Sequence, residues 1–162
     1  MYKPVHRKQK TTHKKTELFK FEPLAKRINR HLKRDGIVLN FLGYRDTILE
    51  YFRIIDNHLG EVFDMTIECN LWFQYFSDLE GLIQYKKLDL DLDLDILKAS
   101  HDGKTPNNEA EPKIEELRLK ILDFTAFLAQ IEVQKHFFSR AAYQCAKLYD
   151  RGTNTMRYRS VN

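Results

Sequence analysis

The sequence is poor in the residues that interrupt or cross-link a chain, with 6 glycines, 4 prolines and 2 cysteines among 162 residues. This composition excludes a disulfide-stabilised secreted domain and collagen-like or linker-like chains. No stretch approaches the ~18 consecutive apolar residues of a membrane span, and no apolar segment follows the basic N-terminus as in a secretory signal. These absences predict a reducing intracellular compartment such as the cytoplasm, or a nucleoprotein particle.

Local motifs for catalysis and metal binding are also missing. No two histidines stand three or four residues apart, and neither Cys69 nor Cys145 has a cysteine or histidine at ligand spacing. The alternate aspartates at 89–95 resemble the start of a calcium loop, but Leu94 and Ser100 stand where such a loop needs a glycine and a carboxylate. We therefore predict no enzymatic activity, no metal and no cofactor.

Charge is segregated along the chain. Residues 1–35 carry 12 Lys or Arg against 3 Asp or Glu, residues 36–111 carry 6 against 15, and residues 112–162 carry 9 against 5. The three segments therefore have net charges of +9, −9 and +4. Residues 1–22 are predicted to be a disordered basic arm that contacts an acidic partner, above all nucleic acid. An arm that only aids solubility, or that pairs with the acidic middle of the chain, is the alternative.

Residues 23–35 are predicted to form a short amphipathic helix. Pro23 suits a first helical turn, apolar residues recur every four positions from Leu24 to Leu32, and Gly36 follows as a stop. The other side of this helix is dense in cations and suits phosphate binding, although an ordinary solvated face has the same character.

Two long apolar repeats dominate the rest of the chain. Alternating steps of four and three residues meet one polar residue, His58, over 44–83 and one, Lys135, over 114–149. Repeats sustained over five to six heptads are typical of helices that wrap around each other. We predict that the two helices pair as an antiparallel, coiled-coil-like hairpin.

The predicted helices cover about 44–86 and about 112–150, and Gly60 or Gly81 could bend or interrupt the first. If the facing ends of the two helices meet, the numbers of contacting residues sum to about 197. The apolar band of the first helix is wider than one partner helix covers. It is therefore expected to meet the short helix, a second subunit or another protein.

This register makes specific predictions about side chains. Lys135 is expected beside Glu61 or exposed at the edge of the hairpin, and Cys145 beside Tyr51 or Phe52. Cys69 is then about 25 Å from Cys145 along the helix, so the two cysteines are predicted to be buried free thiols.

The connection at 87–111 opens with strict alternation of leucine and aspartate from Leu88 to Asp95. Alternation of period two predicts a short strand, which would need a partner strand because its edges are free. A continuation of the preceding helix is the alternative, since aspartate is a poor strand former.

Residues 152–162 are predicted to be a basic tail that begins at Gly152. Arg157 and Arg159 flank a tyrosine, and this grouping can pair with phosphates and stack on bases. An ordinary frayed tail is the alternative.

The sequence thus predicts an all-α protein with a basic arm (1–22), a helical domain (23–151) and a basic tail (152–162). We interpret it as a non-enzymatic, nucleic-acid-binding accessory or assembly subunit of a nucleoprotein complex, forming a homo-oligomer or part of a larger complex and not associated with membranes. The alternatives are a scaffolding or adaptor protein that uses the basic arm and the acidic Leu/Asp segment, and an enzyme whose catalytic residues come from distant positions. Phosphate contacts alone do not read sequence or distinguish DNA from RNA. The predicted nucleic-acid-binding residues are Lys3, Arg7, Lys8, Lys10, Lys14, Lys15, Lys26, Arg27, Arg30, Lys33, Arg34, Arg157 and Arg159.

Overall fold

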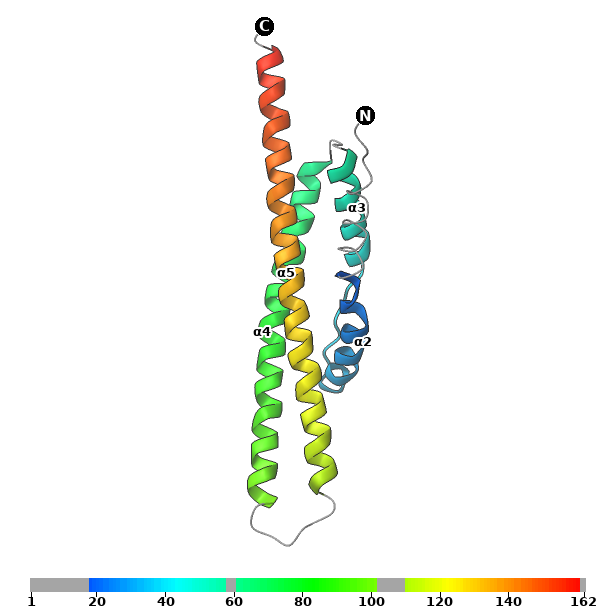
Figure 1. The fold of residues 1–162 in the computed structure, drawn as a ribbon, viewed down its shortest axis with the longest axis vertical. Coiled ribbons are helices and arrows are strands. Elements are labelled where there is room, and N and C mark those ends of the chain that lie inside the picture. The colour runs from blue at the N-terminus through cyan, green and yellow to red at the C-terminus, as the bar shows by residue number, and fades with distance from the viewer. Residues whose placement is uncertain (1–17, 58–60, 102–109, 161–162) are drawn as a thin grey trace, which may run out of the picture. The chain divides into compact units, whose positions relative to one another are not determined.

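The computed structural model describes residues 18–57, 61–101 and 110–160, apart from the side chains of residue 57 and of residues 154–160. This part of the chain is all-α, as predicted, and contains no strand (Figure 1). Its elements are α2 (Phe21–Leu32), the 3-10 helix η1 (Lys33–Asp35), α3 (Tyr44–Asn57), α4 (Val62–His101) and α5 (Ala110–Ser160).

Contacts divide the described residues into two compact units. Unit 1 takes its residues from 1–19, 40–77 and 133–162, and unit 2 takes its residues from 20–39 and 78–132. Unit 1 therefore contains α3 with the first part of α4 and the second part of α5. Unit 2 contains α2 and η1 with the remaining parts of α4 and α5.

Aromatic rings from three helices form the core of unit 1. The Phe76 ring of α4 lies 5.8 Å from the Tyr44 ring of α3 and 5.9 Å from the Phe138 ring of α5. The Tyr44 hydroxyl donates a hydrogen bond of 2.6 Å to Gln134 Oε1, and Gln134 Nε2 donates one of 3.2 Å to the Leu18 carbonyl. The fully buried Gln134 is tolerated because its polar atoms have partners.

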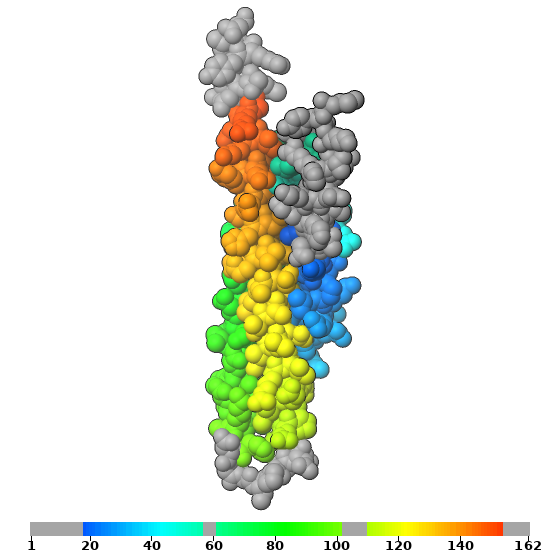
Figure 2. All heavy atoms as spheres, in the orientation of Figure 1, coloured from blue at the N-terminus to red at the C-terminus, as the bar shows by residue number. Residues whose placement is uncertain are grey.

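The core of unit 2 forms where α2 packs on α5. The Phe21 ring of α2 stacks on the Phe127 ring of α5 at 5.1 Å, and Figure 2 shows the atoms of α2 (blue) against those of the first part of α5 (yellow). Gly36 ends the α2–η1 segment with a φ of 74°, which is the left-handed conformation of a helix C-terminus. The Leu39 amide then donates a hydrogen bond of 3.1 Å to Asn29 Oδ1, which ties the following segment to α2.

The strand predicted for the Leu/Asp segment is wrong, because residues 88–95 lie within α4. Leu94 is buried with Ile83 on one side of α4, so a helix extends the stripe that packs in unit 2, whereas a lone strand would have no partner. Lys87 Nζ also lies 2.8 Å from Asp91 Oδ2, an i,i+4 pair that only a helix brings together.

Three other boundaries differ from the prediction. The first long helix is two helices, with α3 ending at Asn57 and α4 beginning at Val62, which agrees with the predicted possibility of an interruption near Gly60, a residue outside the described part of the chain. Gly81 lies inside α4, where an added Cβ would contact nothing within 4 Å beyond the adjacent residues and backbone of its own helix. The helix α5 continues through Gly152 to Ser160, so the predicted tail is largely helical. The N-terminal helix begins at Phe21, because Phe21 itself is buried.

The predicted register is also wrong. In unit 1, Phe63 lies 5.4 Å from Tyr149 and Phe76 lies 5.9 Å from Phe138, ring to ring. These pairs show that α4 and α5 run antiparallel there, with contact numbers summing to 212 and 214 rather than about 197. The difference of about four helical turns arises because α4 extends to His101 and not only to about residue 86.

Candidate nucleic-acid interface

The solvent side of α2 and η1 is a strongly basic helix face. Phe21 and Ile28, at 0% exposed, and Leu32, at 1%, place one side of this segment in the core. At 100° per residue, the basic residues fall within an arc of about 120° centred opposite that buried stripe. All five are exposed: Lys26, Arg27, Arg30, Lys33 and Arg34.

Most of this charge has no ion-pair partner within the described residues. Arg27 Nη1 lies 3.5 Å from Asp123 Oδ1 of α5, and this pair is partly exposed. Solvent screens such a pair, so Asp123 neutralises the charge of Arg27 only weakly. Within the described residues, the other four cations form no ion pair: Lys26, Arg30, Lys33 and Arg34.

His31 lies at the border between the basic face and the core. Its ring centroid is 6.1 Å from that of Phe124, and its Nε2 is 3.9 Å from Asp123 Oδ2. Partial burial lowers the pKa of His31, the Lys120 charge lowers it further, and Asp123 opposes this without reversing it. His31 is therefore neutral at pH 7, and the charge of the face comes from lysine and arginine.

A small cavity of about 200 Å³ lies beside the C-terminal end of this face in unit 2. Its lining mixes the cations Arg34, Lys86 and Lys120 with acidic side chains that include Asp35 and Asp89. Lys86 Nζ lies 2.8 Å from Asp35 Oδ2, and hydrogen bonding to that carboxylate raises the pKa of Lys86. With both signs of charge in its wall, the cavity has no electrostatic preference for an anion.

The structure brings together only part of the predicted binding set. The five cations of α2 and η1 share one face, as described above. Arg157 and Arg159 belong to the last turns of α5, but their side chains lie outside the described part of the chain. The six predicted binding cations of the arm are outside the described residues altogether: Lys3, Arg7, Lys8, Lys10, Lys14 and Lys15.

Sequence reasoning did not identify Asp123 and Lys120 as residues that act on the basic face. Both lie on α5, about 90 positions from α2 in the chain, and neither belongs to the apolar repeat that signalled the helix. Their effect on Arg27 and His31 depends on which side of α5 packs against α2. No local pattern carries that information.

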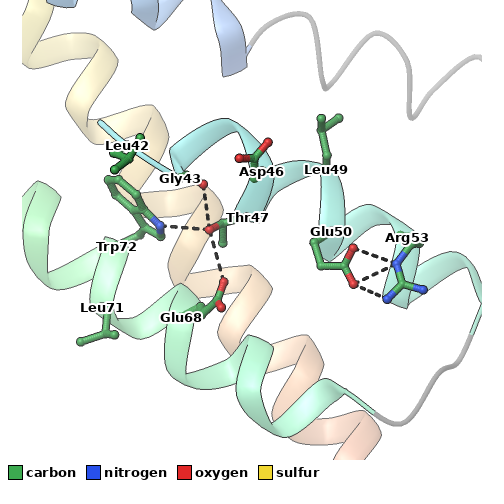
Figure 3. Close-up of a pocket in the computed structure, with 10 residues that line it drawn as sticks. All are labelled: Leu42, Gly43, Asp46, Thr47, Leu49, Glu50, Arg53, Glu68, Leu71 and Trp72. Carbon is green, nitrogen blue, oxygen red and sulfur yellow. Dashed lines mark hydrogen bonds and ion pairs between the residues drawn. The ribbon is translucent and has the colours of Figure 1, made fainter. Parts of the chain in front are cut away.

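Unit 1 has a larger open groove of about 720 Å³ between α3 and α4 (Figure 3). Its wall includes exposed leucines such as Leu42 and Leu71, and the carboxylates Asp46 and Glu68. One side of the groove is held by a hydrogen bond between the two helices, in which the Thr47 hydroxyl accepts from Trp72 Nε1 at 3.1 Å. The lining also includes Arg53, but this cation pairs with Glu50 and Glu61. The remaining acidic and apolar wall does not suit phosphate, so this groove is not part of the candidate interface.

The thiols and tyrosine in the core of unit 1 are not reactive groups. Cys69 and Cys145 are buried and free. Burial raises their pKa values to about 12 and about 11, so neither is a thiolate nucleophile at neutral pH. The Tyr51 hydroxyl donates a hydrogen bond to Gln144 Oε1, so Tyr51 lies beside the residue that precedes Cys145 in the chain. The predicted proximity of Cys145 to Tyr51 is therefore supported, whereas the predicted 25 Å separation of the cysteines came from the wrong register.

In the described ranges, no group of three histidine, cysteine, aspartate or glutamate side chains is placed to hold a metal ion. None of the described helices is long and apolar enough to cross a bilayer. Comparison with known proteins finds no matching family model, no matching curated protein and no matching solved structure.

Proposed function

We propose that this protein is a non-enzymatic nucleic-acid-binding subunit that contacts phosphates through the solvent face of α2 and η1. One observation supports the proposal: four exposed cations of this face have no ion-pair partner among the described residues, while the opposite side of the segment is held in the core. A fixed row of uncompensated cations is costly to hold together unless an anion neutralises it. The basic arm, residues 1–22, immediately precedes this face in the chain and adds seven more cations.

The dimensions of the face suit a nucleic-acid backbone. From Lys26 to Arg34 the helix rises about 12 Å, at about 1.5 Å per residue. Duplex DNA carries about one negative charge per 1.7 Å along its axis, so several phosphates come within reach of this row at once. Contacts of this kind supply affinity and orientation but do not read base sequence.

In this proposal α4 and α5 form an antiparallel, coiled-coil-like hairpin that carries the basic face within a larger nucleoprotein assembly. The antiparallel contacts of Phe63 with Tyr149 and of Phe76 with Phe138 support the hairpin in unit 1. The exposed apolar residues of α4 support assembly with other chains, because they remain uncovered in the described single chain.

The test is binding of labelled duplex DNA and RNA over a salt series, from about 50 to 300 mM, measured by fluorescence anisotropy. A variant with Lys26, Arg30, Lys33 and Arg34 changed to Gln is compared with a control that loses the same charge from exposed cations of α5. The control substitutions are Lys113→Gln, Arg118→Gln, Arg140→Gln and Lys147→Gln.

If the face binds phosphate, each lost contact lowers the slope of log affinity against log salt by about 0.9, or by roughly 3.6 for all four on duplex DNA. The α5 control should change the slope much less. An equal decrease in both variants would show a general charge effect, and an unchanged slope in the α2 variant would refute the proposal.

A further inference from the structure

A second apolar stripe lies on α4, on the side that faces away from the buried residues of unit 2. Four large side chains form this outer α4 stripe: Tyr85, Leu88, Leu92 and Ile96. They are 65%, 67%, 59% and 60% exposed, whereas Ile83 and Leu94 on the opposite side are 0% and 8% exposed. At 100° per residue, the stripe occupies an arc of about 80° opposite Ile83.

The Leu/Asp alternation produces this arrangement. In an α-helix, a step of two residues turns the side chain through about 200°, so alternate leucines point to nearly opposite sides. Leu90 and Leu94 therefore join the covered side, while Leu88 and Leu92 lie on the outer side. This part of α4 is a helix with two apolar sides, only one of which is covered by the described chain.

The same geometry places the aspartates along both borders of the outer α4 stripe. Asp89 and Asp93 lie on one border, and Asp91 and Asp95 lie on the other. Asp91 pairs with Lys87 at 2.8 Å and Asp95 with Lys98 at 3.9 Å, both within α4. In the described part of the chain, Asp89 and Asp93 form no ion pair, although Asp89 raises the pKa of the nearby Lys86.

We propose that the outer α4 stripe binds an amphipathic helix of another protein, whose apolar side is bordered by lysine or arginine. The spacing of the four residues is that of anchors for a helix lying alongside, and Asp89 and Asp93, which form no ion pair in the described part of the chain, select a basic border on the partner. This inference is independent of the proposed nucleic-acid function, because it uses different residues and an opposite sign of charge.

Charge complementarity also argues against a second copy of this chain as the occupant. If two copies of the stripe packed together, Asp89 and Asp93 of one copy would lie beside an aspartate-bearing border of the other, which offers no lysine beyond those already paired with Asp91 and Asp95. Like charges that face each other across an interface oppose association, whereas lysine or arginine on the partner neutralises the aspartates. The partner is therefore a different chain with basic borders.

The experiment measures binding of three labelled peptides of about 18 residues to the full chain by fluorescence anisotropy. The first peptide has a leucine stripe bordered by lysine and arginine, the second has the same leucines bordered by glutamate, and the third is a scramble of the first. The scramble keeps the charge but has no apolar side, so it measures non-specific attraction to the acidic surface.

Two variants and a control locate the binding. One carries Leu88→Gln, Leu92→Gln and Ile96→Gln, and the other carries Asp89→Asn and Asp93→Asn. The control, Leu119→Gln with Leu122→Gln, changes two exposed leucines of α5 that are 57% and 64% exposed. Because all these positions are exposed or border the stripe, circular dichroism of each variant should match that of the original chain.

The basic-bordered peptide should bind at least about tenfold more tightly than the other two. The triple Gln variant should lose that preference, the Asn variant should show weaker binding with less salt dependence, and the α5 control should bind as the original chain does. Equal binding of all three peptides, or unchanged binding by the triple Gln variant, would overturn the proposal. A dimer of the full chain that the triple Gln variant abolishes, seen by analytical ultracentrifugation, would also overturn it in favour of a second copy.

Discussion

At the scale of single residues, the protonation of His31, which lies between the basic face and the core of unit 2, affects the stability of the fold. Burial and the Lys120 charge lower its pKa below the ordinary value of 6.5. The unfolded chain therefore binds a proton at a pH where the folded chain does not, so the contribution of His31 to folding is lost as the pH falls. The loss begins near pH 6.5 and is complete below the lowered pKa of the folded state.

We expect the free energy of unfolding, measured by urea denaturation, to fall between about pH 7 and pH 5, and His31→Gln to reduce that fall. His136→Gln changes an exposed histidine of α5 and serves as the control. An identical pH dependence in His31→Gln and in the original chain would contradict the assignment of this effect to His31.

At the scale of elements, the glycines of the turns differ from those inside helices. Gly36 and Gly43 have φ values of 74° and 81°, which a side chain rarely adopts, whereas Gly81 lies inside α4 with open space around it. Alanine at position 81 reduces the conformational entropy of the unfolded chain and causes no strain in the helix. Alanine at position 36 or 43 would strain the backbone of the folded state.

Gly81→Ala is therefore expected to raise the free energy of unfolding by about 0.5–1 kcal/mol, and Gly36→Ala or Gly43→Ala to lower it by about 1–2 kcal/mol. Urea denaturation followed by circular dichroism measures both effects. If Gly81→Ala destabilised the protein, α4 would not be a regular helix at that point.

At the scale of the whole molecule, the N-terminal region contains two segments with different roles. Residues 1–16 are mainly polar and basic, whereas the following segment places Leu18, Phe21, Ile28 and Leu32 in the cores of the two units. Each large apolar side chain contributes about 1.5–3 kcal/mol on burial. Their sum is comparable with the ~5–15 kcal/mol that stabilises a whole domain.

A chain that lacks residues 1–16 should keep its thermal unfolding midpoint within a few degrees, while one that lacks residues 1–35 should lose its cooperative transition. Circular dichroism melting curves distinguish the two truncations. Only the shorter truncation is suitable for testing the basic arm in nucleic-acid binding. Similar midpoints for both would show that α2 contributes little to folding, and would remove the fixed scaffold on which the proposed interface depends.

The sequence alone predicted many of the side chains that leave water, because helical periodicity is a local property. The repeat predicted the burial of Cys69 and Phe76 on α4 and of Phe138 on α5, and all three are buried. It also located the cations of the short helix opposite its apolar stripe. These predictions needed only the identity of residues three and four positions apart.

The tertiary structure decided how these elements pair, because pairing depends on residues far apart in the chain. The Leu/Asp pattern is compatible with a strand of period two and also with a helix that has two apolar sides. The packing of Leu94 in the core of unit 2 favours the helix. That extension of α4 in turn sets the register with α5. The position of Asp123 beneath Arg27 depends on the side of α5 that α2 covers, and only contacts between distant segments determine that side.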